Sequence, residues 1–302
     1  MSQAIDQKDL GLALLGRSMP RKCGVADVSS GRPDALPAGA LHPAVGEWVD
    51  ADGPGPYASS TIARMHTRRS HGLLVAPAGP QGASHVLLSN VAATVFVNGA
   101  TFSLATDKFP GIEPTGGYKH VSVFAEDPLP RWEYLVGGYK LEHTLGIVRG
   151  HAAVVLRYTW RGPLGAVLEA RPLLAMRPAD ELMSEHGGLI NEVRIRSGEA
   201  VVRPVASLPT MAFRYQGTFV GSPDWWRRFE YVGDRDCGLS YQEDLWTPGV
   251  IRKVLVPDQD VFIVCAMHSL PGDTGEELLQ RSAEIAQQGV DTVSPAKAFT
   301  QG

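Results

Sequence analysis

The clearest structural signal in the chain is a β-hairpin pattern: Thr94-Val95-Phe96-Val97, then Asn98-Gly99, then Ala100-Thr101-Phe102-Ser103-Leu104. β-Branched and aromatic residues are frequent in both arms, as they are in strands. Asn-Gly accepts the two positive φ angles of a type I′ turn, whose twist matches that of antiparallel strands. The segment therefore predicts an antiparallel hairpin that turns at residues 98–99.

Short strand-like segments separated by turns continue from about Gly72 onward. A second hairpin is predicted for residues 131–136 and 139–145 across Gly137-Gly138, and a third for residues 152–160 and 166–176 across Gly162-Pro163-Leu164-Gly165. Further strands are predicted at residues 192–196, 200–205, 211–216, 250–256 and 261–267. The 33 glycines and 22 prolines of the 302 residues are typical of a chain that turns often.

Together these segments predict about thirteen strands and no helix long enough for a crossover between parallel strands. A parallel sheet is therefore excluded. The expected fold class is all-β, with two large antiparallel sheets packed face to face.

One amphipathic helix is predicted near the end of the chain. Asp273 is expected to cap it, with Glu276 completing a capping box, and Gly289 to end it. Its apolar stripe comprises Leu278, Leu279, Ile285 and Ala286. We expect three regions: a loose arm over 1–44, a β-domain over 45–270, and a linker helix with a polar tail over 271–302.

Composition and charge exclude several classes of function. With 28 Lys and Arg against 32 Asp and Glu, the formal net charge is −4, so the chain lacks the basic field that nucleic-acid binding requires. It has no run of about 18 apolar residues and no basic flank before its early apolar segment, so no membrane partner and a cytoplasmic location are expected. The histidines show no metal-ligand spacing and cofactor fingerprints are absent, so no metal or cofactor is expected.

A series of motifs follows in one order along the chain. Glu47-Trp48 precedes Asp52-Gly53-Pro54-Gly55-Pro56-Tyr57-Ala58-Ser59-Ser60-Thr61 and Thr67-Arg68-Arg69-Ser70-His71-Gly72-Leu73-Leu74. The later motifs are Phe109-Pro110-Gly111, Phe124 with Asp127-Pro128-Leu129-Pro130, Trp226 with Phe229-Glu230-Tyr231, and Glu243-Asp244-Leu245 with Pro248-Gly249. Over about residues 46–268 the series resembles the N-terminal domain of bacterial and archaeal glycogen debranching enzymes, the amylo-α-1,6-glucosidase family. Pro54, Pro56 and Ser70 depart from that family's pattern.

The resemblance implies a galactose-mutarotase-like supersandwich, in agreement with the strand pattern. It also implies that the glycosidase carboxylates lie in a C-terminal (α/α)6 barrel, for which the residues after Leu270 are too few. We therefore expect a non-catalytic β-domain, with no catalytic residue of its own, that helps to bind α-glucan and packs against such a barrel in cis or in trans. Glycogen and maltooligosaccharides are the implied ligands.

Nine residues are candidates for contacts with a sugar or with the barrel: Tyr57, Arg68, Arg69, His71, Trp225, Trp226, Glu230, Glu243 and Asp244. Arg68, Arg69 and His71 form a dense row of donors, with Tyr57 upstream, and such a loop can hold sugar hydroxyls or a carboxylate of the partner barrel. The alternative is structural, with an arginine in an ion pair and His71 bonded to a backbone carbonyl.

The two tryptophans lie in a loop-like stretch that follows Gly221-Ser222-Pro223-Asp224. Indole faces suit the apolar faces of glucose units. Because the family motif matches Trp226, Trp225 is expected to be the more exposed of the two. The alternative is that one indole packs into the sandwich and the adjacent arginines form surface ion pairs.

Three of these candidates are carboxylates that could be interpreted as catalytic: Glu230, Glu243 and Asp244. Glycoside hydrolysis needs two carboxyl groups about 5–10 Å apart across the scissile bond. Adjacent residues of a strand point to opposite faces, so Glu243 and Asp244 are not expected to share one sugar. Two alternatives to glucan binding remain: an aldose-mutarotase-like enzyme that pairs His71 or His120 with Glu230 or Glu243, and a purely structural chain that docks a separate barrel.

Overall fold

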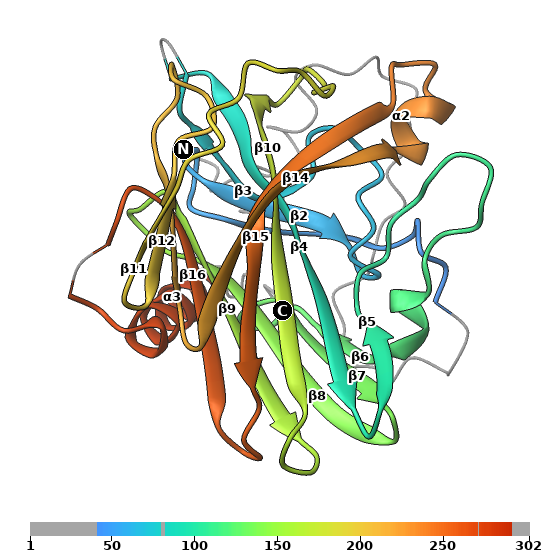
Figure 1. Cartoon of the computed structure of the whole chain (residues 1–302), viewed down its shortest axis with the longest axis vertical. Helices are drawn as coiled ribbons and strands as arrows, with labels where there is room; N and C mark the ends of the chain where they lie inside the picture. Colours follow the sequence, from blue (N-terminus) through green and yellow to red (C-terminus); the bar gives the residue numbers. More distant parts are fainter. Residues whose placement is uncertain (1–40, 80–81, 271, 292–302) are drawn as a thin grey trace, which may run out of the picture.

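Two antiparallel sheets of eight strands each form the computed structural model, which describes residues 41–79, 82–270 and 272–291 (Figure 1). Sheet I has the order β1 (Glu47–Ala51), β2 (Tyr57–Thr61), β3 (Gly72–Pro77), β4 (Ser84–Val97), β10 (Val167–Pro178), β15 (Gln242–Val254) and β14 (Thr218–Glu230), and β5 (Ala100–Ser103) pairs with β4. Sheet II has the order β11 (Val193–Arg196), β12 (Glu199–Val202), β13 (Met211–Tyr215), β16 (Asp260–Met267), β9 (Ala153–Arg161), β8 (Tyr139–Ile147), β7 (Arg131–Val136) and β6 (Val121–Ala125).

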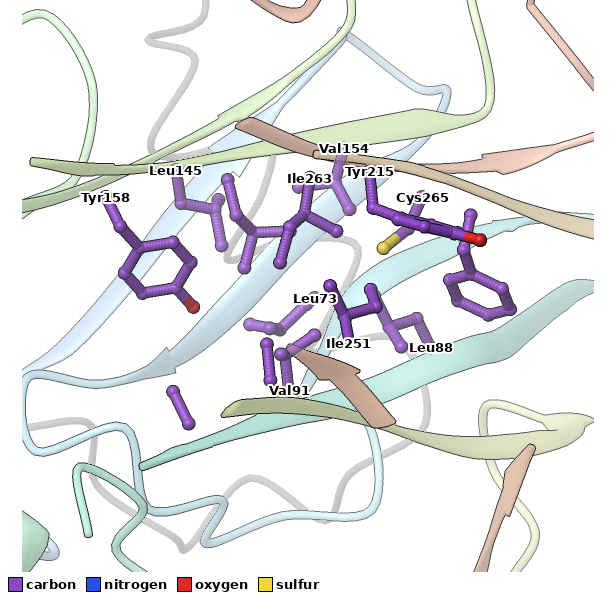
Figure 2. Packing of buried hydrophobic residues seen from close by; sticks show 14 of the residues in the cluster. Leu73, Leu88, Val91, Leu145, Val154, Tyr158, Tyr215, Ile251, Ile263 and Cys265 are labelled. Carbon is purple, nitrogen blue, oxygen red and sulfur yellow. The ribbon is translucent and has the colours of Figure 1, made fainter. Parts of the chain in front are cut away.

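The main core lies between the two sheets. Figure 2 shows side chains of sheet I facing side chains of sheet II, among them Leu73, Leu88 and Val91 opposite Leu145, Val154 and Ile263. Each of these six is at most 1% exposed. Full burial of such a side chain contributes about 1.5–3 kcal/mol. The predicted all-β class with two packed antiparallel sheets is confirmed.

Two of the predicted hairpins are confirmed in register. Val97 pairs with Ala100 across Asn98 and Gly99, whose φ angles are 53° and 76°. Val136 pairs with Tyr139 across Gly137 and Gly138, whose φ angles are 59° and 86°. Positive φ at both central residues is what a type I′ turn requires.

The third predicted hairpin is wrong, because its two arms belong to different sheets. β9 lies between β8 and β16 in sheet II, whereas β10 lies between β4 and β15 in sheet I. The connection crosses from one sheet to the other, and the Trp160 indole Nε1 donates a hydrogen bond to Pro163 O at 2.9 Å. Gly and Pro mark a change of direction in the sequence, but they do not specify which strand the chain meets next.

Five strands, β1, β2, β3, β6 and β14, had no residue range in the sequence prediction. β1 and β2 precede Gly72, and β14 includes Trp225 and Trp226, which the sequence placed in a loop. The register of β14 against β15 shifts between Gly221 and Asp224 and again between Trp226 and Phe229. These irregularities interrupt the strand pattern in the sequence. In addition, β15 begins at Gln242, eight residues before the predicted start at Val250.

The C-terminal helix α3 (Gly275–Asp291) packs on the outer face of sheet II through Leu278 and Leu279. Its capping box is formed by Thr274 and Glu277, one residue later than predicted: Thr274 N donates to Glu277 Oε2 at 2.7 Å, and Glu277 N donates to Thr274 Oγ1 at 3.2 Å. Asp273 instead pairs with Arg281.

The rest of the helix prediction is partly wrong. The helix continues past Gly289, and Ile285 is 41% exposed, so Ile285 is outside the buried stripe. Two short helical segments, η2 (Gly116–His120) and α2 (Val232–Asp236), complete the described secondary structure. Within the described residues, no helix combines the length and the apolar character needed to cross a bilayer. Most of the predicted arm and the tail after residue 291 lie outside the described residues.

Gly249 provides a test of the β14–β15 pairing. Its φ is +148°, and an added Cβ would lie 2.2 Å from the carbonyl oxygen of Val220 on the neighbouring strand. We expect Gly249→Ala to lower the free energy of unfolding by more than about 1 kcal/mol, measured by urea denaturation. Gly187→Ala is the control, since nothing lies within 4 Å of its added Cβ. Equal stability of the two variants would contradict this account of the pairing.

Candidate functional site

A pocket of about 280 Å³ lies on the outer face of sheet I, the face turned away from sheet II. Successive residues of β4 point to opposite faces: Ala93 and Val95 belong to the core between the sheets, whereas Ala92 and Thr94 line the pocket. The lining residues come from β4, β5, β10, β14, β15 and the loop 104–115: Ala92, Thr94, Ser103, Ala105, Asp107, Phe109, Thr115, Glu169, Arg171, Trp226 and Val250.

The loop 104–115 closes one side of the pocket and is held by its own hydrogen bonds. Asp107 N donates to Thr115 Oγ1 at 2.7 Å, and Thr115 N donates to Asp107 O at 2.9 Å. Lys108 Nζ donates to the carbonyls of Phe109 and Ile112. Glu230 N donates to Lys108 O at 2.8 Å, so the loop is also attached to the end of β14. These contacts hold Asp107 and Phe109 in the lining of the pocket.

An aromatic side chain and a guanidinium line the pocket together. The guanidinium carbon of Arg171 lies 5.5 Å from the centroid of the Trp226 ring, within the range of a cation–π interaction. The pairing of β4 with β10 places Arg171 beside Ala92 and Glu169 beside Thr94. Phe109 packs on Phe229, with ring centroids 5.0 Å apart.

Asp107 is the exceptional group of the pocket. Its side chain is 9% exposed, and within the described part of the chain its carboxyl makes neither a hydrogen bond nor an ion pair. Burial raises the pKa of this carboxyl to about 6, and the Arg64 guanidinium partly opposes the shift. The other pocket carboxylate, Glu169, is ion-paired with Arg252.

This set of groups suits a ligand with both apolar and hydroxyl surfaces. Aromatic walls bind apolar faces, while a carboxyl, a guanidinium and the hydroxyls of Thr94 and Ser103 offer hydrogen bonds. Among residues 41–79, 82–270 and 272–291, no three His, Cys, Asp or Glu side chains are grouped as metal ligands would be.

The structure separates the two predicted tryptophans. Both are half-buried, but Trp226 lines the pocket, whereas Trp225 packs against the core between the sheets and lies 5.7 Å from the His186 ring. The tryptophan that lines the pocket is therefore the one in the family motif, whereas the two indoles have the same class of burial. Arg227, next to them, is ion-paired with Glu185 at the surface.

The donors of the Thr67–His71 segment are largely used within the protein. Arg68 Nε donates to Glu47 Oε1 at 2.8 Å. Arg69 donates from its backbone N and from Nε to the buried Asp234 carboxylate, both at 2.9 Å, which attaches the segment to α2. His71 Nδ1 accepts a hydrogen bond from Thr67 N, and burial with the nearby Arg68 charge lowers the pKa of His71 to about 3.

Tyr57 likewise has an internal partner, because its hydroxyl donates to Ser70 O at 3.1 Å and burial raises its pKa. None of Tyr57, Arg68, Arg69 and His71 is among the residues that line the pocket. Their arrangement fits the structural alternative for this motif.

The predicted carboxylates are held apart by different partners. Glu243 is buried in a bidentate pair with Arg177, at 2.6 and 2.8 Å, and also accepts hydrogen bonds from Tyr231 OH and Met183 N. Glu230 accepts from Gln242 Nε2 and faces Lys108 Nζ. Asp244 accepts from the backbone N of Glu185 and of Arg228. None of the three lines the pocket that contains Trp226.

The histidines proposed for a mutarotase-like site are also occupied elsewhere. His71 lies 3.6 Å from Glu47, and the His120 ring contacts Phe102 with centroids 5.7 Å apart. Among the described contacts, neither histidine meets Glu230 or Glu243.

Sequence reasoning missed Asp107, Glu169 and Arg171 as site residues. Asp107 lies two residues before the Phe109-Pro110-Gly111 motif, which was the available signal. Glu169 and Arg171 alternate with buried Leu168 and Ala170 along β10, a pattern shared by any half-exposed strand.

Comparison with known proteins gives one family. Residues 46–262 match the family model described as glycogen debranching enzyme N terminal. A search of curated proteins finds no match to the chain.

Removing Arg177, the ion-pair partner of Glu243, tests whether the Glu243 carboxylate has a structural role. Arg177→Met leaves a buried carboxylate without its cation, and we expect a loss of about 3–5 kcal/mol of unfolding free energy, measured by chemical denaturation. Arg194→Met, which breaks an exposed pair with Glu192, is the control and should behave like the wild type. A similar, small effect of both variants would refute the structural role of the Glu243 pair.

Proposed function

Because the chain belongs to the family of glycogen debranching enzyme N-terminal domains, we propose that it is a non-catalytic, α-glucan-binding β-domain whose sugar site is the Trp226 pocket. The observation that carries the proposal is the combination of an indole, a guanidinium and an unpaired carboxyl in one pocket on the outer face of sheet I. The family relationship supports an α-glucan as the ligand.

The chemistry of a glucose unit matches this lining. The carbon–hydrogen face of the ring packs against Trp226, and the hydroxyls both donate and accept hydrogen bonds. Arg171 supplies donors and Asp107 supplies acceptors in the same pocket. A pocket of about 280 Å³ on one sheet face suits a short stretch of glucan rather than a long groove.

Packing against an (α/α)6 barrel, in cis or in trans, is the second part of the proposal and rests on the family relationship. Ile195 of β11 and Val220 of β14 are 50% and 42% exposed and lie on strands that contact each other. They are apolar side chains that a partner domain would cover.

Substitution of the two tryptophans tests glucan binding. Calorimetric titration with maltoheptaose is expected to show that Trp226→Ala weakens binding at least about tenfold, as loss of a central aromatic contact does. Trp225→Ala is the matched control and should bind as the wild type does, because its ring packs on the core side. Thermal unfolding of both variants establishes that they are folded.

Two results would contradict this assignment. Equal weakening by both substitutions would show that Trp226 is not a specific contact. Absence of binding of both maltoheptaose and glycogen to the wild type would remove glucan binding and leave barrel docking as the role of the domain.

The non-catalytic part of the proposal has its own test. Since Glu230, Glu243 and Asp244 are each held by protein donors, we expect the purified chain to release no glucose from α-1,6-branched dextrin. Glucose release can be followed with a coupled assay. Turnover that persists in pure preparations would overturn this part.

A further inference from the structure

Asp107 differs from the other buried carboxylates of the described chain. Asp50 accepts from Ile147 N and Arg149, Asp234 from Arg69, Glu230 from Gln242, and Glu243 from Arg177. Among the buried Asp and Glu side chains that the structure describes, Asp107 alone has no such donor. Burying a carboxylate without a partner is costly, and native structures seldom keep such a group without a use for it.

Asp107 lines two separate spaces. It lines the main pocket with Trp226 and Arg171, and it also lines a much smaller space of about 10 Å³ with Asn90, Lys108 and Glu230. The smaller space has about the volume needed for one water molecule. Asp107 therefore borders both the main pocket and the smaller space.

The neighbouring groups favour a neutral polyol as the ligand. A cationic ligand would pair with Asp107 but would meet the Arg171 guanidinium in the same pocket. A purely apolar ligand would pack on Trp226 but would leave the carboxyl and the guanidinium without partners. A sugar ring satisfies both groups, because its hydroxyls donate to a carboxylate and accept from a guanidinium.

We propose that Asp107 is the specificity-determining residue of the pocket: its ionised carboxyl accepts hydrogen bonds from hydroxyls of a glucose unit that packs against Trp226. This inference rests on the proposed glucan binding and adds a contact that depends on charge. The hydrogen bonds favour the ionised form of Asp107, so the glucan binds that form more tightly than the protonated form.

Several charged or titratable side chains surround Asp107 in the two spaces that it lines. They are Arg64, His66, Lys108, Glu169, Arg171 and Glu230. Glu169 and Glu230 have the cationic partners Arg252 and Lys108. His66 is neutral above pH 5, because burial and the nearby His71 lower its pKa to about 3. Tyr231, which also lines the small space, has a pKa well above its usual value because it is buried.

The resulting pH dependence has a definite sign. The pKa of Asp107 is raised to about 6, so the carboxyl is ionised at pH 7.5 and largely protonated at pH 5. Affinity for the glucan should be full above this pKa and should fall as the pH drops through it. If only the protein with ionised Asp107 binds the glucan, the apparent Kd rises about tenfold as the pH falls from 7.5 to 5.

The test is calorimetric titration of maltoheptaose at pH 7.5 and pH 5.0 into the wild type and Asp107→Asn. We expect the wild type to bind about tenfold more weakly at pH 5.0, and Asp107→Asn to bind weakly and equally at both values. Glu192→Gln, at an exposed carboxylate paired with Arg194, is the control and should keep the wild-type profile.

Thermal unfolding without sugar gives a second measurement. A carboxyl whose pKa is raised by folding stabilises the protein at low pH, and this contribution is lost as the pH rises through the folded-state pKa. Asp107→Asn should therefore raise the unfolding midpoint at pH 7.5 relative to the wild type. This result would show that the residue is retained at a cost in stability.

The outcomes separate the two proposals. Binding that depends on Trp226 but is independent of pH and unchanged in Asp107→Asn overturns the role of Asp107 and leaves glucan binding intact. Tighter binding at pH 5.0 than at pH 7.5 also overturns it. A wild type that binds no maltoheptaose overturns the proposed function, and the role of Asp107 with it.

Discussion

The alternation of side chains along β4 connects the core of the sandwich to the pocket on its outer face. β4 is fourteen residues long and pairs with β3, β5 and β10. Ala93 and Val95 are buried between the sheets, while Ala92 and Thr94 form part of the pocket. A shift of one residue in register would exchange these faces, so the apolar core also holds the pocket lining in place. The register of β10 on β4 then sets the positions of Glu169 and Arg171.

Buried charge in this domain serves two purposes. Arg69 with Asp234 and Arg177 with Glu243 join segments that are more than sixty residues apart in sequence. Such pairs hold irregular segments in one arrangement, because either partner alone would be a buried, uncompensated charge. Among the described residues, Asp107 has no hydrogen-bond or ion-pair partner for its carboxyl, and it lines the pocket on the outer face of sheet I. The conspicuous charged segment Thr67–His71 thus forms ion pairs within the domain. The buried carboxyl without such a partner among the described residues, Asp107, lies in the loop 104–115, which is less conspicuous in the sequence.

The parts of the fold that sequence patterns predicted are those that depend on neighbouring residues. The hairpins at Asn98-Gly99 and Gly137-Gly138 follow from the φ angles that these residues accept. The third hairpin failed because its turn residues are equally compatible with a crossing between sheets. Strand β14 was missed because its register shifts break the period-two pattern around Gly221 and Phe229. The observed capping box lies one residue later than the predicted one, because both Asp273 and Thr274 are suitable caps.

The sequence by itself determined the all-β class, two hairpins and, through its ordered motifs, the family. These properties depend on residue type and local spacing, which can be read directly from the chain. Only the tertiary structure decided which sheet each strand joins and which of the two tryptophans lines the pocket. It also decided that, within the described part of the chain, the Asp107 carboxyl has no partner while Glu243 has three donor groups. The physical reason is that burial and pairing depend on residues brought together from distant segments, here β4, β5, β10, β14 and the loop 104–115.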